Sequence, residues 1–169
     1  MKYKILFCCL FFYLGSLAQN KDDIKILKDK VDATNMKLKN FKTMLLPTDR
    51  SATGDSSEIK IFTDASKNIE VIKETYWSGT GKTFIWNYLE GTRPYFVYKE
   101  IFTYVSPVTG SRLNDGNFTK QEERYYFKNG RIIQWMTGKS IHKGYHTNSA
   151  KVENDMMENI DKIIAKFNK

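Results

Sequence analysis

Between residues 58 and 136, β-rich segments follow one another with only short turns between them. No helical pattern interrupts this series, so the strands are expected to pair as antiparallel neighbours and not through parallel βαβ units. The clearest turn is Asn129-Gly130, because both residues tolerate the positive φ that a two-residue hairpin turn requires. The expected strands span residues 58–63, 69–77, 82–90, 94–105, 122–128 and 131–136. Polar, turn-rich segments predict loops at 48–57, 107–117 and 138–147.

Amphipathic helices are predicted on both sides of this strand region. Apolar residues at three- and four-residue steps indicate one helix from Asp22 to Leu46, stopped by Pro47, and another from Ala150 to Phe167. Each helix carries one apolar stripe that has to be buried against other elements. We therefore expect an α+β fold: an N-terminal helix, an antiparallel sheet of five or six strands and a C-terminal helix. Packing both helices on one face of the sheet is the simplest way to bury the stripes.

The first residues have the pattern of an export signal. Lys2 and Lys4 precede the ten apolar residues Ile5 to Leu14, and the small residues Ser16 and Ala18 follow them. This order of a positive region, an apolar region and a small-residue cleavage site is typical of a signal peptide. Ten residues make a helix of about 15 Å, half of the roughly 30 Å that a membrane span requires.

We therefore predict a signal peptide over residues 1–19, no transmembrane anchor after its cleavage, and a single α+β domain over residues 20–169. The expected location is the periplasm or the cell exterior. Acylation of Cys8 or Cys9 is the alternative, but both lie inside the apolar run and not after it. Once these two cysteines leave with the signal, disulfides, thiolate nucleophiles and cysteine-bound metals are excluded.

Composition and charge narrow the classes of protein further. A hydrophobic content of 41% with 14% aromatics is too rich for a disordered chain, and a mean hydropathy of −0.52 excludes a polytopic membrane protein. Loss of Lys2 and Lys4 lowers the net charge from +8 to +6, which stays basic. A basic surface outside the cell favours acidic glycans, anionic membrane faces or simply solubility. Nucleic acid is not expected as a partner, because the lysines are scattered along the chain.

Two short motifs resemble ligand-binding sequences, and both are better explained as turns or loops. Ser78 to Thr83 contains Gly-Lys-Thr, but a phosphate-binding loop needs a glycine where Tyr76 stands, and strand-like residues follow it. We interpret it as a turn between two strands. His142 and His146 are four residues apart, yet two ligands are too few for a zinc site. No metal or cofactor is expected.

Catalytic residues are not expected either. Glu74 with Glu90, or Glu122 with Glu123, would be the carboxylate pairs to consider for glycoside hydrolysis. The sequence does not fix the separation of the carboxylates, which decides that chemistry. We expect all four side chains to be exposed on strands.

Aromatic residues are the main functional signal. Of the 24 aromatic residues, 19 follow the predicted signal, and many alternate along strands. Where neighbouring residues are both aromatic, some rings must lie on the face that the helices leave open. Such rings offer a platform for sugars, peptides or partner proteins. The alternative is that tyrosines simply suit strands. The candidate ligand-binding residues are Trp86, Tyr88, Tyr98 and Trp135.

Three segments also resemble a group of uncharacterised exported proteins of Gram-negative bacteria that have a tyrosine-rich antiparallel sheet. They are Tyr76-Trp77-Ser78-Gly79, Arg124 to Gly130, and Ile133-x-Trp135. The resemblance covers residues 58 to 136, implies export and an antiparallel sheet, and carries no assigned activity.

The expected function is therefore that of an exported, non-enzymatic domain. It would bind a protein or a cell-envelope component, such as an envelope glycan, through its sheet. One alternative is a protein that binds a small ligand or glycan in an aromatic pocket between the sheet and the helices. The other is a hydrolase whose catalytic residues form no recognisable sequence motif. The sequence leaves the oligomeric state open.

Overall fold

The computed structural model describes residues 21–47, 56–104, 118–143 and 147–168. The predicted signal peptide and the loop at 107–117 lie outside the described residues, as does most of the loop at 48–57. A helix at residues 21–37, called the N-terminal helix below, is followed by the short η1 (Leu38–Asn40). The chain ends in α2 (Thr147–Phe167). Between them lie β1 (Lys42–Leu46), β2 (Ser56–Thr63), β3 (Ile69–Ser78), β4 (Gly81–Glu90), β5 (Arg93–Tyr104), β6 (Phe118–Lys128), β7 (Arg131–Thr137) and β8 (Ser140–Lys143).

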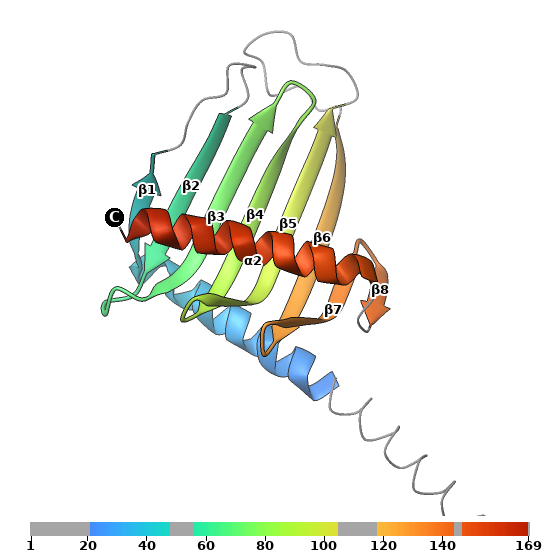
Figure 1. Ribbon diagram of the computed structural model, residues 1–169, viewed down its shortest axis with the longest axis horizontal. Coiled ribbons are helices and arrows are strands. Elements are labelled where there is room, and N and C mark those ends of the chain that lie inside the picture. Colours follow the sequence, from blue (N-terminus) through green and yellow to red (C-terminus); the bar gives the residue numbers. More distant parts are fainter. Residues whose placement is uncertain (1–20, 48–55, 105–117, 144–146, 169) are drawn as a thin grey trace, which may run out of the picture.

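All eight strands form one antiparallel sheet in which each strand pairs with its neighbours in the sequence, from β1 to β8 (Figure 1). The predicted α+β class and the antiparallel pairing are therefore confirmed. β2 to β7 are the six strands expected from alternation. The β6–β7 turn is at Asn129-Gly130, with φ of 52° and 74°, as predicted. The predicted turn between β3 and β4 is also present at Gly79-Thr80.

The predicted number of five or six strands is wrong because two short edge strands carry little sequence signal. β1 lies in the segment 22–46 that was expected to be entirely helical, whereas the helix ends at residue 37. Pairing with β2 buries Leu46 against Ile61, and this tertiary contact overrides the helical spacing. β8 lies in the expected loop at 138–147. Gly138, with φ of 56°, turns the chain back so that β8 pairs with β7.

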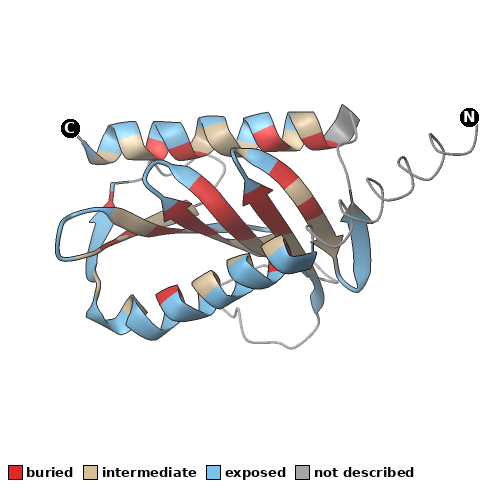
Figure 2. Cartoon of the chain, turned by 90° about the horizontal axis from the view of Figure 1, so that it is seen from below, coloured by how far each residue is buried: buried red, intermediate tan, exposed pale blue. Residues whose placement is uncertain are grey.

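The two helices lie on opposite faces of the sheet and not on one face as predicted (Figure 2). Ile24 of the N-terminal helix packs in a cluster with Val71, whereas Ile160 of α2 packs in a cluster with Ile72. Successive residues of a strand point to opposite faces. Because both Val71 and Ile72 are fully buried, each face of the sheet is apolar and needs its own helix.

The helices do not cover the sheet evenly. Both cross it near the end that carries the β2–β3, β4–β5 and β6–β7 turns, and the opposite ends of β3 to β6 extend beyond them (Figure 1). The β3–β4 turn lies at this far end. The face on which the N-terminal helix lies is called the N-helix face below, and the other the α2 face.

The close approach of β4 to β5 at the far end requires a glycine at position 81. A Cβ on Gly81 would lie 2.2 Å from the backbone oxygen of Phe102, whereas one on Gly79 would meet nothing within 4 Å. We expect Gly81→Ala to lower the free energy of unfolding by about 1–3 kcal/mol, because backbone has to shift. Gly79→Ala is the matched control and should change it by less than about 0.5 kcal/mol. Urea unfolding measures both, and equal effects would contradict the close approach.

Candidate functional site

A pocket lies between the N-terminal helix and the sheet, and it is called the aromatic pocket below. Its volume is about 420 Å³. The sheet contributes four rings and a guanidinium, and the helix side contributes an amide and apolar side chains. The lining residues are Val31, Asn35, Leu38, Trp86, Tyr88, Phe96, Tyr98 and Arg124. Three of the four predicted ligand-binding residues, Trp86, Tyr88 and Tyr98, therefore line one hollow.

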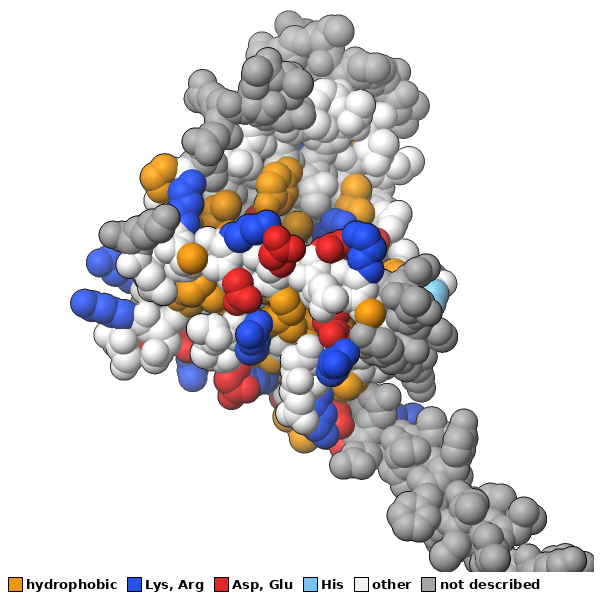
Figure 3. Space-filling view, in the orientation of Figure 1, with side chains coloured by type: hydrophobic (Ala, Val, Ile, Leu, Met, Phe, Trp, Pro, Cys, Tyr) orange, Lys and Arg blue, Asp and Glu red, His pale blue; other side chains and the backbone are white. Residues whose placement is uncertain are grey.

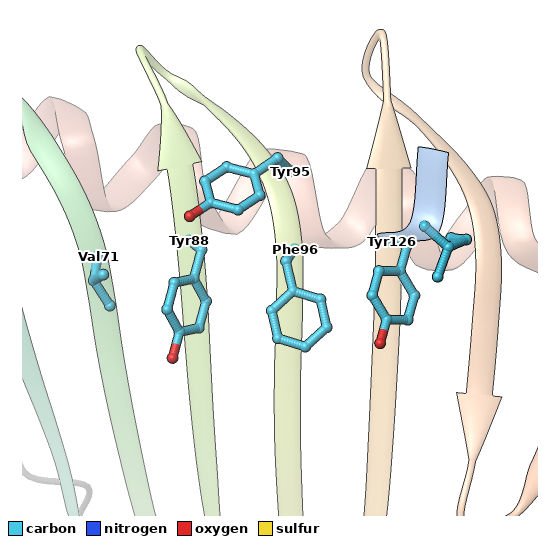
Figure 4. Close-up of a cluster of buried hydrophobic side chains, with 6 residues drawn as sticks. Val71, Tyr88, Tyr95, Phe96 and Tyr126 are labelled. Carbon is cyan, nitrogen blue, oxygen red and sulfur yellow. The ribbon is translucent and has the colours of Figure 1, made fainter. Parts of the chain in front are cut away.

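The strand register brings these rings together. Trp86 pairs with Tyr98, and Tyr88 pairs with Phe96, across β4 and β5. Directly opposite residues of an antiparallel pair lie on the same face of the sheet. Tyr88 and Phe96 have ring centroids 5.5 Å apart, and Phe96 and Tyr126 have centroids 5.0 Å apart. Figure 4 shows these last three rings side by side on β4, β5 and β6, with α2 behind the sheet.

Hydrogen bonds hold the tyrosine hydroxyls at the edge of the pocket. The hydroxyl of Tyr88 donates to Oδ1 of Asn35 at 2.9 Å, which ties the ring to the N-terminal helix. The hydroxyl of Tyr98 donates to Oε1 of Glu100 at 2.9 Å. The Arg124 guanidinium lies 5.4 Å from the centroid of Tyr98 and pairs with Glu122. The pocket thus has an aromatic floor with polar groups around it, an arrangement suited to a ligand that has both apolar and hydrogen-bonding parts.

Trp135, the fourth predicted residue, lies on the α2 face and is not part of this pocket. It stacks on Tyr125 with a centroid distance of 5.6 Å, and its indole N–H donates to Oγ1 of Thr137. It lines a second hollow of about 440 Å³ under α2, called the α2 cavity below. The polar side chains that line this cavity are those of Glu74, Asn87, Lys99, Glu123, Asp155 and Asn159.

Glu74 is fully buried at the wall of the α2 cavity, which contradicts the expectation that it is exposed. Its oxygens accept hydrogen bonds from the hydroxyl of Tyr76, from the amide of Asn87 at 2.8 Å and from the amide of Asn159 at 2.9 Å. Since Asn159 belongs to α2, this buried carboxylate fastens the helix to the sheet. The sequence did not predict the burial of Glu74. Both faces of β3 are buried at this point, so a polar residue in this strand need not be exposed.

The carboxylate pairs considered from the sequence do not form. Glu90 is 77% exposed and pairs with Lys30, so it shares no environment with the buried Glu74. Glu122 and Glu123 point to opposite faces of β6 because they are successive strand residues. Glu122 pairs with Lys120, and Glu123 accepts a hydrogen bond from Tyr125.

Among the described residues, no group of three or more His, Cys, Asp or Glu side chains lies close enough to hold a metal ion. His142 lies in β8, with its ring centroid 5.2 Å from that of Trp135, and His146 lies outside the described residues. The aromatic pocket and the α2 cavity are lined by rings, amides and charged side chains.

Burial of tyrosine rings makes the fold sensitive to alkaline pH. Desolvation raises the pKa of six described tyrosines: Tyr76, Tyr88, Tyr95, Tyr98, Tyr125 and Tyr126. A raised pKa in the folded state stabilises the fold fully below the ordinary pKa of about 10, and that stability is lost as the pH rises above it. We expect the free energy of unfolding to fall between about pH 10 and 12. Urea titrations with tyrosinate absorbance test this, and tyrosines that ionise near pH 10 in a fold of undiminished stability would contradict it.

The Glu74 contacts predict a large effect of a small change. In Glu74→Gln, one acceptor oxygen becomes an amide donor that faces the donors of Tyr76 or Asn159. Because the site is fully buried, we expect a loss of about 1–3 kcal/mol in the free energy of unfolding. The exposed Glu90→Gln is the control and should change it by less than about 0.5 kcal/mol. Similar effects of the two substitutions would refute a fastening role for Glu74.

Comparison of the chain with protein-family models, with curated proteins and with solved structures finds no match. None of the described helices has both the length and the apolar character to span a membrane.

Proposed function

We propose that the chain is an exported binding protein, periplasmic or secreted, that holds a carbohydrate in the aromatic pocket. The observation that carries the proposal is the meeting of Trp86, Tyr88 and Tyr98 with Arg124 and Asn35 in one hollow. The export part rests on the signal-peptide pattern of residues 1–19. An envelope glycan is the ligand class that such a location makes available.

The chemistry of a sugar matches this pocket. The C–H bonds on one face of a sugar ring carry partial positive charge, which the negative face of an aromatic ring attracts. Hydroxyl groups at the sugar's edge can bond to the Asn35 amide and to the Arg124 guanidinium. A volume of about 420 Å³ lies in the range of small-ligand pockets, which is about 300–1,000 Å³.

Binding of a protein through the sheet has less support from the geometry of the aromatic pocket. A flat interface would require rings displayed on an open surface. Trp86 and Tyr98 are instead half-buried in a hollow beside the helix, and Tyr88 is buried. The carbohydrate proposal therefore takes precedence over the protein-partner hypothesis.

The test is isothermal titration calorimetry, in which purified residues 20–169 are titrated with peptidoglycan fragments and with neutral and acidic oligosaccharides. We expect Trp86→Ala or Tyr98→Ala to weaken binding of any ligand at least about tenfold, because each ring supplies roughly 1–3 kcal/mol of stacking and burial. Trp135→Ala removes a ring from the opposite face and should leave the affinity unchanged.

Circular dichroism and thermal unfolding of each variant separate lost binding from lost folding. Binding that depends on Trp135 and not on Trp86 would move the site to the α2 cavity. Absence of binding to every member of the panel would count against a carbohydrate ligand.

A further inference from the structure

The N-helix face continues beyond the aromatic pocket as a strip of rings toward the far end of the sheet. The rings of Phe84 and Phe102 meet edge to face at 5.8 Å, and those of Phe102 and Phe118 meet at 5.2 Å. Trp77 pairs with Lys82 across β3 and β4 at the same end. These four aromatic residues, called the aromatic strip below, lie on the same face as Trp86. The pairing register links each strand to the next, and residues an even number of positions apart in one strand point to the same face.

Two lysines lie on this strip, and among the described residues neither has an ion-pair partner. The Lys73 ammonium is 4.4 Å from the ring centroid of Trp86 and 5.4 Å from that of Phe84. The Lys82 ammonium is 4.3 Å from the centroid of Phe84. The other described strand lysines of this face are ion-paired: Lys60 with Glu58, Lys120 with Glu100 and Glu122, and Lys128 with Asp23.

The two ammonium groups share one ring, so their positive charges repel each other. Burial lowers the pKa of Lys73, and the neighbouring charges of Lys60 and Lys82 lower it further, while Glu58 and Glu100 act in the opposite direction. A bound anion would relieve this repulsion, and it would compensate for the hydration that the ammonium group of Lys73 loses on burial. The contacts with the rings of Phe84 and Trp86 offset the repulsion only in part.

We infer that Lys73 and Lys82, beside the ring of Phe84, form an anion site adjoining the aromatic pocket, and that the ligand is an acidic glycan. A sugar ring would occupy the aromatic pocket, and carboxylates of the same chain would contact the ammonium groups of Lys73 and Lys82. The sugar part rests on the proposed function, whereas the anion site rests on the lysine geometry alone.

The charges on this face favour a glycan over nucleic acid. Glu58, Glu100 and Glu122 lie on the same face as the lysines and are ion-paired with Lys60 and Lys120, so those two lysines are not available to a row of closely spaced phosphates. Among the described strand side chains of this face, Lys73 and Lys82 are the two cations without an ion pair, so few phosphates would be neutralised by the sheet. An acidic glycan with one carboxylate per sugar unit or per disaccharide carries fewer charges that need neutralising, which suits a site of two lysines.

The α2 face has a different charge pattern, which supplies a control. Figure 3 shows positive and negative side chains interspersed along α2. Lys151 pairs with Asp155 and Lys162 pairs with Glu158, each one helical turn apart. Lys151→Gln/Lys162→Gln therefore removes the same total charge as Lys73→Gln/Lys82→Gln, but from the opposite face.

The experiment compares oligomers of galacturonate, alginate and hyaluronate with the same oligomers after reduction of their carboxyl groups to alcohols. Calorimetry is performed on residues 20–169 at low and moderate salt. We expect at least one acidic oligomer to bind about tenfold or more tightly than its reduced form. Lys73→Gln/Lys82→Gln should abolish that difference without changing the affinity for the reduced form. The α2 control should keep the difference, and Lys73→Arg/Lys82→Arg should keep it too.

Each other outcome overturns a defined part of the inference. Equal binding of an acidic oligomer and its reduced form removes the anion site and leaves the carbohydrate proposal standing. Binding of none of the acidic oligomers refutes the acidic-glycan ligand, and binding of neutral sugars then decides the carbohydrate proposal separately. Oligo-thymidylate is titrated as a nucleic-acid probe. If it binds more tightly than every acidic oligomer, and Lys73→Gln/Lys82→Gln abolishes that binding, the anion site stands but its ligand is a single-stranded nucleic acid and not a glycan.

Discussion

The burial of both faces of one antiparallel sheet is the constraint on which the rest of the structure depends. β3 shows it directly, because the successive residues Val71 and Ile72 are both fully buried although they point to opposite faces. Tyr125 and Tyr126 repeat the pattern in β6. Each buried aromatic or aliphatic side chain contributes about 1.5–3 kcal/mol only when water is excluded from it. If both helices packed on one face, the side chains of the other face would stay in contact with water. Each face is therefore covered by its own helix.

Both helices are fixed to the sheet by apolar burial and by polar contacts. α2 is held by polar contacts as well as by its apolar stripe: Glu74 accepts from Asn159, and Glu153 accepts from the backbone N–H of Ile132 at 3.0 Å. The N-terminal helix buries Ile24 and is joined to the sheet by the hydrogen bond between Thr34 and Tyr95 at 2.9 Å. Beside this helix, Trp86 of β4 and Tyr98 of β5 stay half-buried and line the aromatic pocket.

The sequence predicted the parts of the fold that depend on local alternation. β2 to β7 and the Asn129-Gly130 turn follow from strand patterns, and the grouping of Trp86 with Tyr88 follows from their two-residue spacing. The parts that depend on contacts distant in the sequence were missed, namely β1, β8, the separation of the helices and the burial of Glu74. Trp135 was predicted as a ligand-binding residue together with Trp86, Tyr88 and Tyr98, and the structure places it on the opposite face of the sheet from these three. Alternation alone cannot tell which of the two faces Trp135 shares, whereas the register pairs it with Tyr125.

The lysines of the N-helix face are not explained by the need to cover a sheet. Threonine or valine at positions 73 and 82 would suit strands and would bring no like charges together. Contacts between an ammonium and a ring contribute about 0.5–1 kcal/mol at exposed sites, which offsets desolvation and repulsion only partly. Lys120, with two carboxylates beside it, shows how the same face neutralises a lysine when stability alone is served. Lys73 and Lys82 lack such partners among the described residues and share the Phe84 ring. An arrangement that stability does not favour is expected where an external anion supplies the missing charge, and the aromatic pocket and the two lysines would then form one binding surface.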